Sequence, residues 1–137
     1  MDTKFRVWCE FEVKGEMVSC MESEASWFLL TQTGQLMEYG PMRPPHRLSG
    51  AYKKAIPLFF AGLLDKNGKE IYKGDVVSWS DGWNNYKSSI IFENGAFRES
   101  RFKNPLEEIC HYWDNGKYIE CEVIGNIYEN PELLKKG

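Results

Sequence analysis

The sequence predicts a mainly β protein: a small β-barrel preceded by β-hairpins and followed by a short helix. Three observations support this fold class. In residues 63–79, a short run at 70–72 lies between turn sequences at 65–68 and 73–75, and a β-branched and aromatic run at 76–79 follows the second turn. An Asn-Gly pair at 94–95 separates two further runs, which is typical of a β-hairpin. Finally, five Trp, seven Tyr and eight Phe supply enough apolar area to fill a core.

The N-terminal part of the chain predicts two β-hairpins. Residues 4–13 alternate strictly, so that Phe5, Val7 and Cys9 share one face with the apolar residues that follow them. A turn at 14–16 leads to a returning strand at 17–21. Residues 27–31 and 35–39 form the second predicted hairpin, because Gly34 supplies the positive φ that its turn requires.

A proline-rich segment follows these hairpins. Residues 40–50 contain three prolines, which lack amide donors and favour extended predecessors, so we expect a long cationic loop rather than regular structure. Such a loop is either a solvated connector or a contact arm for an anionic surface, in nucleic acid or in an acidic protein. The apolar run at 54–63 contains Pro57, which favours an edge or entry strand.

The C-terminal half predicts further strands and two short helical segments. Strands are expected at 88–92, 96–99 and 118–128, with Gly125 marking a bulge or a close backbone approach. Residues 104–113 are expected to contain one helical turn, with Asn104 as N-cap and Pro105 at the first helical position. Residues 130–136 have the features of a short helix, because an Asn-Pro start is followed by Glu and then by lysines.

The length of 137 residues fits one domain with two parts. Residues 1–61 are expected to form the hairpins and the proline-rich loop, packed on the barrel, and residues 62–137 to form the barrel core with its C-terminal helical turn.

The net charge of −3 argues against a general nucleic-acid coat, which needs clustered cations. However, residues 40–64 contain four cations and no acid: Arg43, Arg47, Lys53 and Lys54.

The cysteines and the apolar runs bear on compartment and cofactors. Cys9, Cys20, Cys110 and Cys121 include no pair at two-residue spacing, which favours free thiols over a zinc site or disulfides. The sequence has neither a secretory signal nor a run of about 18 apolar residues. We therefore expect a cytosolic protein without a membrane segment, metal or other cofactor.

Three blocks of sequence resemble the YopX family of phage and prophage proteins. They are the starting residues 4–8, the central Gly-Leu-Leu-Asp-Lys-Asn-Gly-Lys-Glu-Ile-Tyr-Lys-Gly-Asp-Val-Val at 62–77, and Glu-Val-Ile-Gly-Asn-Ile-Tyr-Glu-Asn-Pro-Glu-Leu-Leu at 122–134. The resemblance implies a bacteriophage or prophage origin, a site of action in the cytoplasm of a bacterial host, and an SH3-type barrel. It supplies no catalytic residue and no ligand set.

Catalytic motifs are missing from the sequence. It contains no phosphate-binding glycine loop, no Gly-x-Ser-x-Gly and no His-Glu-x-x-His. Cys110 and His111 are adjacent, so on a strand their side chains would point to opposite faces, which disfavours a thiolate–imidazole pair. We therefore expect a binding protein rather than an enzyme.

The candidate binding residues are aromatic and cationic. Trp79, Trp83, Tyr86, Tyr112 and Trp113 are near predicted turns or strand ends, and Trp83 lies among polar turn residues, where burial is least expected. An exposed aromatic patch would mark a protein or peptide interface. The partner-binding residues predicted on these grounds are Trp83, Tyr86, Arg43, Arg47, Lys53 and Lys54.

Three functional hypotheses follow. The first is a non-catalytic module that binds a host or phage protein and inhibits a host defence or nucleic-acid-processing factor, since an acidic protein suits a basic partner. The second is nucleic-acid binding through the four cations, with Trp83 or Tyr86 stacking on bases. The third is a structural protein that oligomerises through exposed strand edges; the sequence does not define the oligomeric state.

Overall fold

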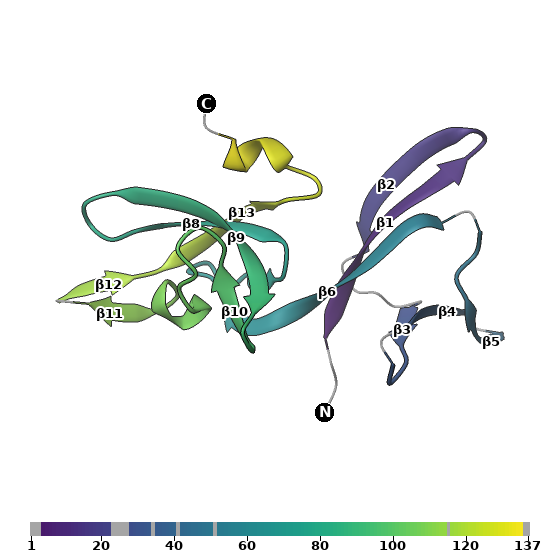
Figure 1. The fold of residues 1–137 in the computed structure, drawn as a ribbon, viewed down its shortest axis with the longest axis horizontal. Coiled ribbons are helices and arrows are strands. Elements are labelled where there is room, and N and C mark those ends of the chain that lie inside the picture. The colour runs from purple at the N-terminus through teal and green to yellow at the C-terminus, as the bar shows by residue number, and fades with distance from the viewer. Residues whose placement is uncertain are drawn as a thin grey trace. The chain divides into compact units, whose positions relative to one another are not determined.

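The computed structural model describes residues 4–22, 28–33, 35–40, 42–50, 52–114 and 116–135. The fold is mainly β, as predicted. The chain divides into two compact units, Met1–Phe59 and Phe60–Gly137, and each is described by itself. One long strand, β6 (Tyr52–Leu64), contributes residues to both units (Figure 1).

The first unit contains the first predicted hairpin. Strands β1 (Phe5–Val13) and β2 (Glu16–Glu22) pair in antiparallel fashion. Lys14 and Gly15 turn the chain with φ values of 51° and 81°, the two positive values that a two-residue turn between twisted strands requires. The other edge of β1 pairs with β6, where Pro57 lies opposite Val7. β6 has no second partner at Pro57 among the described residues, so the proline lies on a sheet edge, as expected.

A second, three-stranded sheet in this unit consists of β3 (Phe28–Leu30), β4 (Leu36–Gly40) and β5 (Arg43–Arg47). β3 and β4 confirm the second predicted hairpin, although Gly34 lies outside the described residues. The prediction of an irregular loop over residues 40–50 was wrong for β5. Among the described residues β5 pairs only with β4, and an edge strand needs fewer amide donors, so its prolines are accommodated.

Apolar side chains from both sheets form the core of the first unit. Val7 and Cys9 on β1 and Phe28 on β3 are its buried members. Tyr52 packs on Phe28 with ring centroids 6.0 Å apart. Val7 and Cys9 confirm the predicted buried face in the middle of β1, but Val13 at its end is 45% exposed, and Trp8 on the opposite face is also buried.

The second unit contains a curled, half-barrel sheet in which the strand order is β10-β9-β8-β13 (Figure 1). Its strands are β8 (Asp75–Ser80), β9 (Asn85–Glu93), β10 (Ala96–Glu99) and β13 (Cys121–Asn126). A short strand, β7 (Glu70–Tyr72), pairs with the last residues of β6. Strands β11 (Tyr112–Asp114) and β12 (Lys117–Ile119) form a separate hairpin.

Local turn chemistry explains the β9–β10 hairpin. Asn94 and Gly95 have φ values of 53° and 78°, which confirms the predicted Asn-Gly turn.

The single predicted strand at 118–128 is instead two strands. The chain leaves its partner β11 at Ile119 and pairs with β8 from Cys121 onward, so the ladder is interrupted at Glu120.

Gly125 lies at a bulge, as predicted. The register between β13 and β8 shifts between Val123 and Gly125. A Cβ added to Gly125 would come within 2.6 Å of the Asn130 side-chain oxygen and 2.7 Å of a Leu133 methyl. Both proposed roles of this glycine, bulge and close approach, are therefore present.

Both predicted helical segments are short 3-10 helices. The first, η1 (Leu106–Glu108), begins after Pro105, which occupies the N-cap position predicted for Asn104. The second, η2 (Pro131–Leu134), follows Asn130, whose side-chain oxygen accepts a hydrogen bond from the Asn126 amide at 3.3 Å and does not cap the helix. Neither segment is long enough for the macrodipole argument that the sequence suggested.

The half-barrel sheet packs on an apolar core. Ile71, Val77, Ile90 and Leu106 are almost completely buried in it, together with further residues from β8 and β13. No helix among the described residues is long and apolar enough to cross a membrane.

Candidate functional site

A stacked aromatic pair lies at the centre of the candidate site in the second unit. Trp79 on β8 lies directly opposite Tyr86 on β9, which places both side chains on one face of the sheet. Their ring centroids are 5.5 Å apart and the rings are inclined by 29°. Trp79 is buried and Tyr86 is half-buried, so Tyr86 presents the accessible part of the pair.

The turn between these strands is organised by one carboxylate. Asp81 Oδ1 accepts hydrogen bonds from the amides of Trp83 and Asn84 at 2.8 and 2.7 Å. Asp81 Oδ2 accepts a third from the Tyr86 hydroxyl at 2.9 Å. These bonds, first those from the Asn84 and Trp83 amides, hold the pKa of Asp81 below its usual range, so the carboxylate stays ionised. The backbone of the turn is therefore fixed.

Trp83 projects from this fixed turn. Its side chain is 82% exposed, as the polar surroundings in the sequence suggested. A large apolar side chain on an ordered backbone exposes much apolar area with little conformational freedom left to lose on binding. Trp83 therefore fits the predicted role of a contact residue.

A small cavity, the acidic pocket, lies beside the turn. Its volume is about 430 Å³. It is lined by Trp79, Asp81, Tyr86, Phe102, Asn104, Glu108, Ile109, Tyr112 and Ile119. Phe102 meets Tyr86 edge to face, with centroids 5.5 Å apart. The lining thus combines aromatic rings with the carboxylates of Asp81 and Glu108, and it includes no cationic residue.

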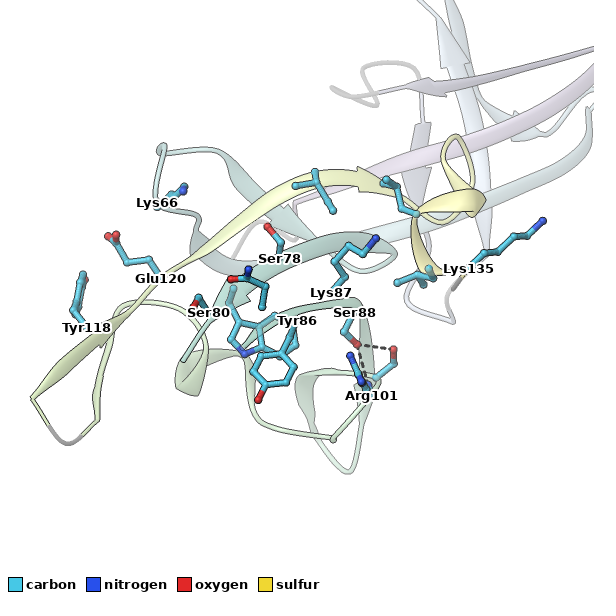
Figure 2. A pocket seen from close by; sticks show the side chains of 16 residues that line it. Lys66, Ser78, Ser80, Tyr86, Lys87, Ser88, Arg101, Tyr118, Glu120 and Lys135 are labelled. Atoms are coloured by element: carbon cyan, nitrogen blue, oxygen red, sulfur yellow. Dashed lines mark hydrogen bonds between the residues drawn. The ribbon is translucent and has the colours of Figure 1, made fainter. Parts of the chain in front are cut away.

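A larger open groove, the basic groove, is also lined by Trp79 and Tyr86 (Figure 2). Its volume is about 1220 Å³. Its cationic lining residues are Lys66, Lys87, Arg101 and Lys135, and its acidic lining residue is Glu120. Four serines add hydroxyl groups: Ser78, Ser80, Ser88 and Ser100. Trp79 and Tyr86 line both hollows, which therefore share a wall but differ in charge.

Arg101 is positioned in the groove by a buried carboxylate. Glu99 is fully buried, and its carboxylate accepts hydrogen bonds from the amides of Arg101, Phe102 and Asn104 at 3.0, 2.7 and 3.0 Å. The Arg101 amide also donates to Ser88 Oγ at 2.9 Å. The guanidinium carbon then lies 5.8 Å from the Tyr86 ring centroid and 5.0 Å from that of Phe102, within cation–π distance.

The four predicted cations lie in the first unit, separate from Trp83 and Tyr86 in the second. Lys53 and Lys54 are exposed on β6, with their Nζ atoms 3.7 Å from a Glu12 oxygen and 3.9 Å from a Glu10 oxygen. Arg43 and Arg47 begin and end β5, and the Arg47 side chain is exposed. Acidic neighbours therefore offset part of the positive charge on which the nucleic-acid hypothesis depended.

The structure reveals an association of cysteines that sequence spacing did not indicate. Cys9 and Cys20 lie opposite each other on β1 and β2. Burial, followed by the nearby Cys20 and Glu22, raises the pKa of the Cys9 thiol to about 12. In the second unit, a hydrogen bond to Cys110 and then burial raise the pKa of the Cys121 thiol. All four are free thiols, and the described residues contain no group of three potential metal ligands.

His111 and Cys110 lie in a bend rather than on a strand, so the argument from opposite strand faces does not apply. Cys110 Sγ and His111 Nε2 both lie 3.0 Å from the carbonyl oxygen of Leu64. The other imidazole nitrogen, Nδ1, lies 2.8 Å from the Tyr118 hydroxyl. Each side chain is therefore bonded to a structural partner.

Comparison with known proteins places the chain in a family and gives a fold likeness. A family model described as YopX protein matches residues 4–135. The crystal structure of protein EF1440 from Enterococcus faecalis is similar, with a TM-score of 0.57 and 23% sequence identity over 98% of this chain and 99% of that one. A search of curated protein sequences found no match. The likeness to EF1440 concerns the fold alone.

Proposed function

This chain belongs to the YopX family, and from its surface we propose that it is a non-catalytic module that binds a host or phage protein. Trp83 with the acidic pocket beside it forms the recognition site. The observation that carries the proposal is the 82% exposure of Trp83 on a turn whose backbone is fixed by Asp81. Interface anchors are commonly aromatic side chains of this kind.

The pocket chemistry favours a partner with a basic surface. A lysine or arginine side chain entering the pocket would meet the carboxylates of Asp81 and Glu108 together with four aromatic rings. Arg101 illustrates the same chemistry within the chain, since its guanidinium lies over the Tyr86 and Phe102 rings. The net charge of −3 adds long-range attraction to a cationic partner.

The family and the fold suggest a biological setting. The proposal includes a bacteriophage or prophage origin and a cytoplasmic site of action in a bacterial host. It also assigns the half-barrel of the second unit to the SH3 type, in which loops near the barrel rim carry binding residues. A host defence or nucleic-acid-processing factor fits as the target, because such proteins carry basic surfaces that a small acidic protein blocks.

Affinity capture from a host lysate tests this proposal, with nuclease added to remove contacts through nucleic acid. The bait proteins are the unaltered chain, Trp83→Ala, and Met17→Ala as a matched control that removes another exposed apolar side chain, which is 58% exposed in the first unit. We expect one stoichiometric protein with the unaltered chain and with Met17→Ala, and none with Trp83→Ala. Equal recovery with Trp83→Ala would contradict the proposal.

A peptide experiment tests the chemistry of the pocket. Arginine-rich peptides should change the fluorescence of the site tryptophans, and the same peptides with Gln in place of Arg should not. Glu108→Gln should weaken binding, whereas Glu132→Gln, at another exposed carboxylate, should leave it unchanged. Equal binding of both peptides would exclude a pocket for cationic side chains.

A further inference from the structure

We propose that the basic groove of the second unit binds the phosphate backbone of single-stranded nucleic acid. This inference does not depend on the protein partner proposed above, because its cationic lining residues belong to the basic groove alone. It also uses none of the four cations that the sequence had suggested.

The charge of the groove supports an anionic ligand. Lys87, Arg101 and Lys135 form no ion pair within the part of the chain that the structure describes. Lys66 lies 3.5 Å from Glu122, so its charge is partly offset. Three cations that form no ion pair among the described residues thus line one groove of a chain whose net charge is negative, which favours an anionic ligand there.

The position and contacts of Arg101 suit the binding of a phosphate group. Its backbone is held by Glu99 and Ser88, and its guanidinium lies against the Tyr86 and Phe102 rings. The guanidinium forms no ion pair among the described residues, so its N–H groups remain available to phosphate oxygens. The side chain would therefore lose little conformational freedom on binding.

Neutral donors lie beside Lys87, on the sheet face opposite to Trp79 and Tyr86. Ser78 on β8 is directly opposite Lys87 on β9, so the hydroxyl and the ammonium share one face of the sheet. Ser80 follows two residues later on the same face and is exposed. Hydroxyl groups and lysines in this arrangement are typical partners of phosphate oxygens and carry no sequence specificity.

Exposed aromatic rings at one end of the groove favour a single strand over a duplex. Tyr118 lines the groove, is 43% exposed, and packs on Trp113 with ring centroids 5.1 Å apart. Trp113 is 67% exposed. Figure 2 shows Tyr118 and Glu120 at one end, with Lys87, Arg101 and Lys135 toward the other. Unpaired bases stack on such rings while cations contact the backbone, whereas the bases of a duplex are already stacked.

Fluorescence anisotropy with a labelled single-stranded oligonucleotide of about 12 nucleotides tests the inference. The groove variant is Lys87→Gln, Arg101→Gln, Lys135→Gln in one chain. Its matched control, with the same change in charge, is Arg47→Gln, Lys53→Gln, Lys54→Gln in the first unit. Circular dichroism confirms that both variants fold.

At about 50 mM salt the groove variant should bind at least about 10-fold more weakly than the unaltered chain, and the control should bind normally. The slope of log affinity against log salt should fall by about 2, because each phosphate contact to a single strand contributes about 0.7. Tyr118→Ala should weaken binding by about 5-fold or more through loss of stacking.

Four results would overturn the inference. They are no binding by the unaltered chain at low salt, an equal loss in the control variant, equal affinity for a duplex of the same length, and equal affinity for a poly-glutamate peptide. The last result would mean that the groove takes acidic peptides rather than nucleic acid.

Discussion

The Asp65 carboxylate accepts a hydrogen bond at 2.9 Å from the amide of Val123, 58 residues later in the chain. The other carboxylate oxygen accepts from the amides of Asn67 and Lys69 at 2.9 and 2.8 Å. Asp65 is only 2% exposed, so this single side chain fastens the turn after β6 to strand β13.

Stability should therefore depend on the ionisation of Asp65. Burial opposes the charged form, but the amides of Val123, Lys69 and Asn67 outweigh it and hold the pKa below its usual range. A depressed pKa stabilises the folded state above the unfolded pKa of about 4, and this contribution is lost as pH falls through the folded value. Urea titrations from neutral pH downward should show the decline, and Asp65→Asn should lose about 1–3 kcal/mol at neutral pH. A variant as stable as the unaltered chain would contradict this role.

Gly125 should tolerate no side chain. The Cβ of Gly125→Ala would overlap the Asn130 oxygen and a Leu133 methyl, so we expect a loss of about 1–3 kcal/mol in free energy of unfolding. Gly50→Ala is the matched control, because a Cβ there meets nothing within 4 Å. Chemical denaturation of both variants measures the difference, and equal effects at the two positions would show that the close approach is unimportant.

Glu99 should be required for the loop that carries Arg101. Its carboxylate accepts three amide hydrogen bonds in a fully buried position, and Glu99→Gln would turn an NH₂ group toward those donors. We expect a loss of about 1–3 kcal/mol in stability. Glu107→Gln, at an exposed carboxylate, should be nearly neutral by the same thermal or urea measurement.

The two tryptophans of the site should behave in opposite ways. Trp79 is buried in the core, so Trp79→Ala should cost about 3–5 kcal/mol of stability. Trp83→Ala should change stability by no more than about 0.5 kcal/mol while abolishing partner capture. A large loss of stability in Trp83→Ala would assign Trp83 a structural role instead.

Cys9 should resist alkylation in the folded protein. It is 1% exposed, and its pKa is raised to about 12, so very little thiolate is present at neutral pH. Mass spectrometry after brief iodoacetamide treatment should find the half-buried Cys20 modified first, and Cys9 modified only after unfolding. Rapid labelling of Cys9 without unfolding would show that the β1–β2 ladder opens readily.

Much of the fold could be predicted because its determinants are local. The Asn94-Gly95 pair defines one hairpin, and the strict alternation in residues 4–13 defines another strand. Two predictions were wrong where the pairing partner of a strand, and not its local sequence, determines the structure. The prolines at 44 and 45 indicated a loop, but an edge position beside β4 accommodates them. The division at Glu120 reflects a change of pairing partner that no local pattern encodes.

The site was predictable only in part. Trp83 was identified because its neighbours in the sequence are polar, and its high exposure agrees with that reasoning. The cations of the basic groove were missed because Lys66, Lys87, Arg101 and Lys135 come from separate segments that only the folded sheet brings together. The sequence instead drew attention to a dense cationic run, where glutamates on the neighbouring strand β1 offset Lys53 and Lys54.

Trp79 and Tyr86 line both hollows, and this shared lining has a thermodynamic consequence. If a ligand in one hollow favours a particular position of the Tyr86 ring, it alters the shape offered to a ligand in the other. By linkage, the resulting change in affinity must be equal in both directions. Binding of a basic protein in the acidic pocket would then change the affinity of the basic groove for a nucleic-acid strand, and the reverse. The second unit would in this way couple two binding events.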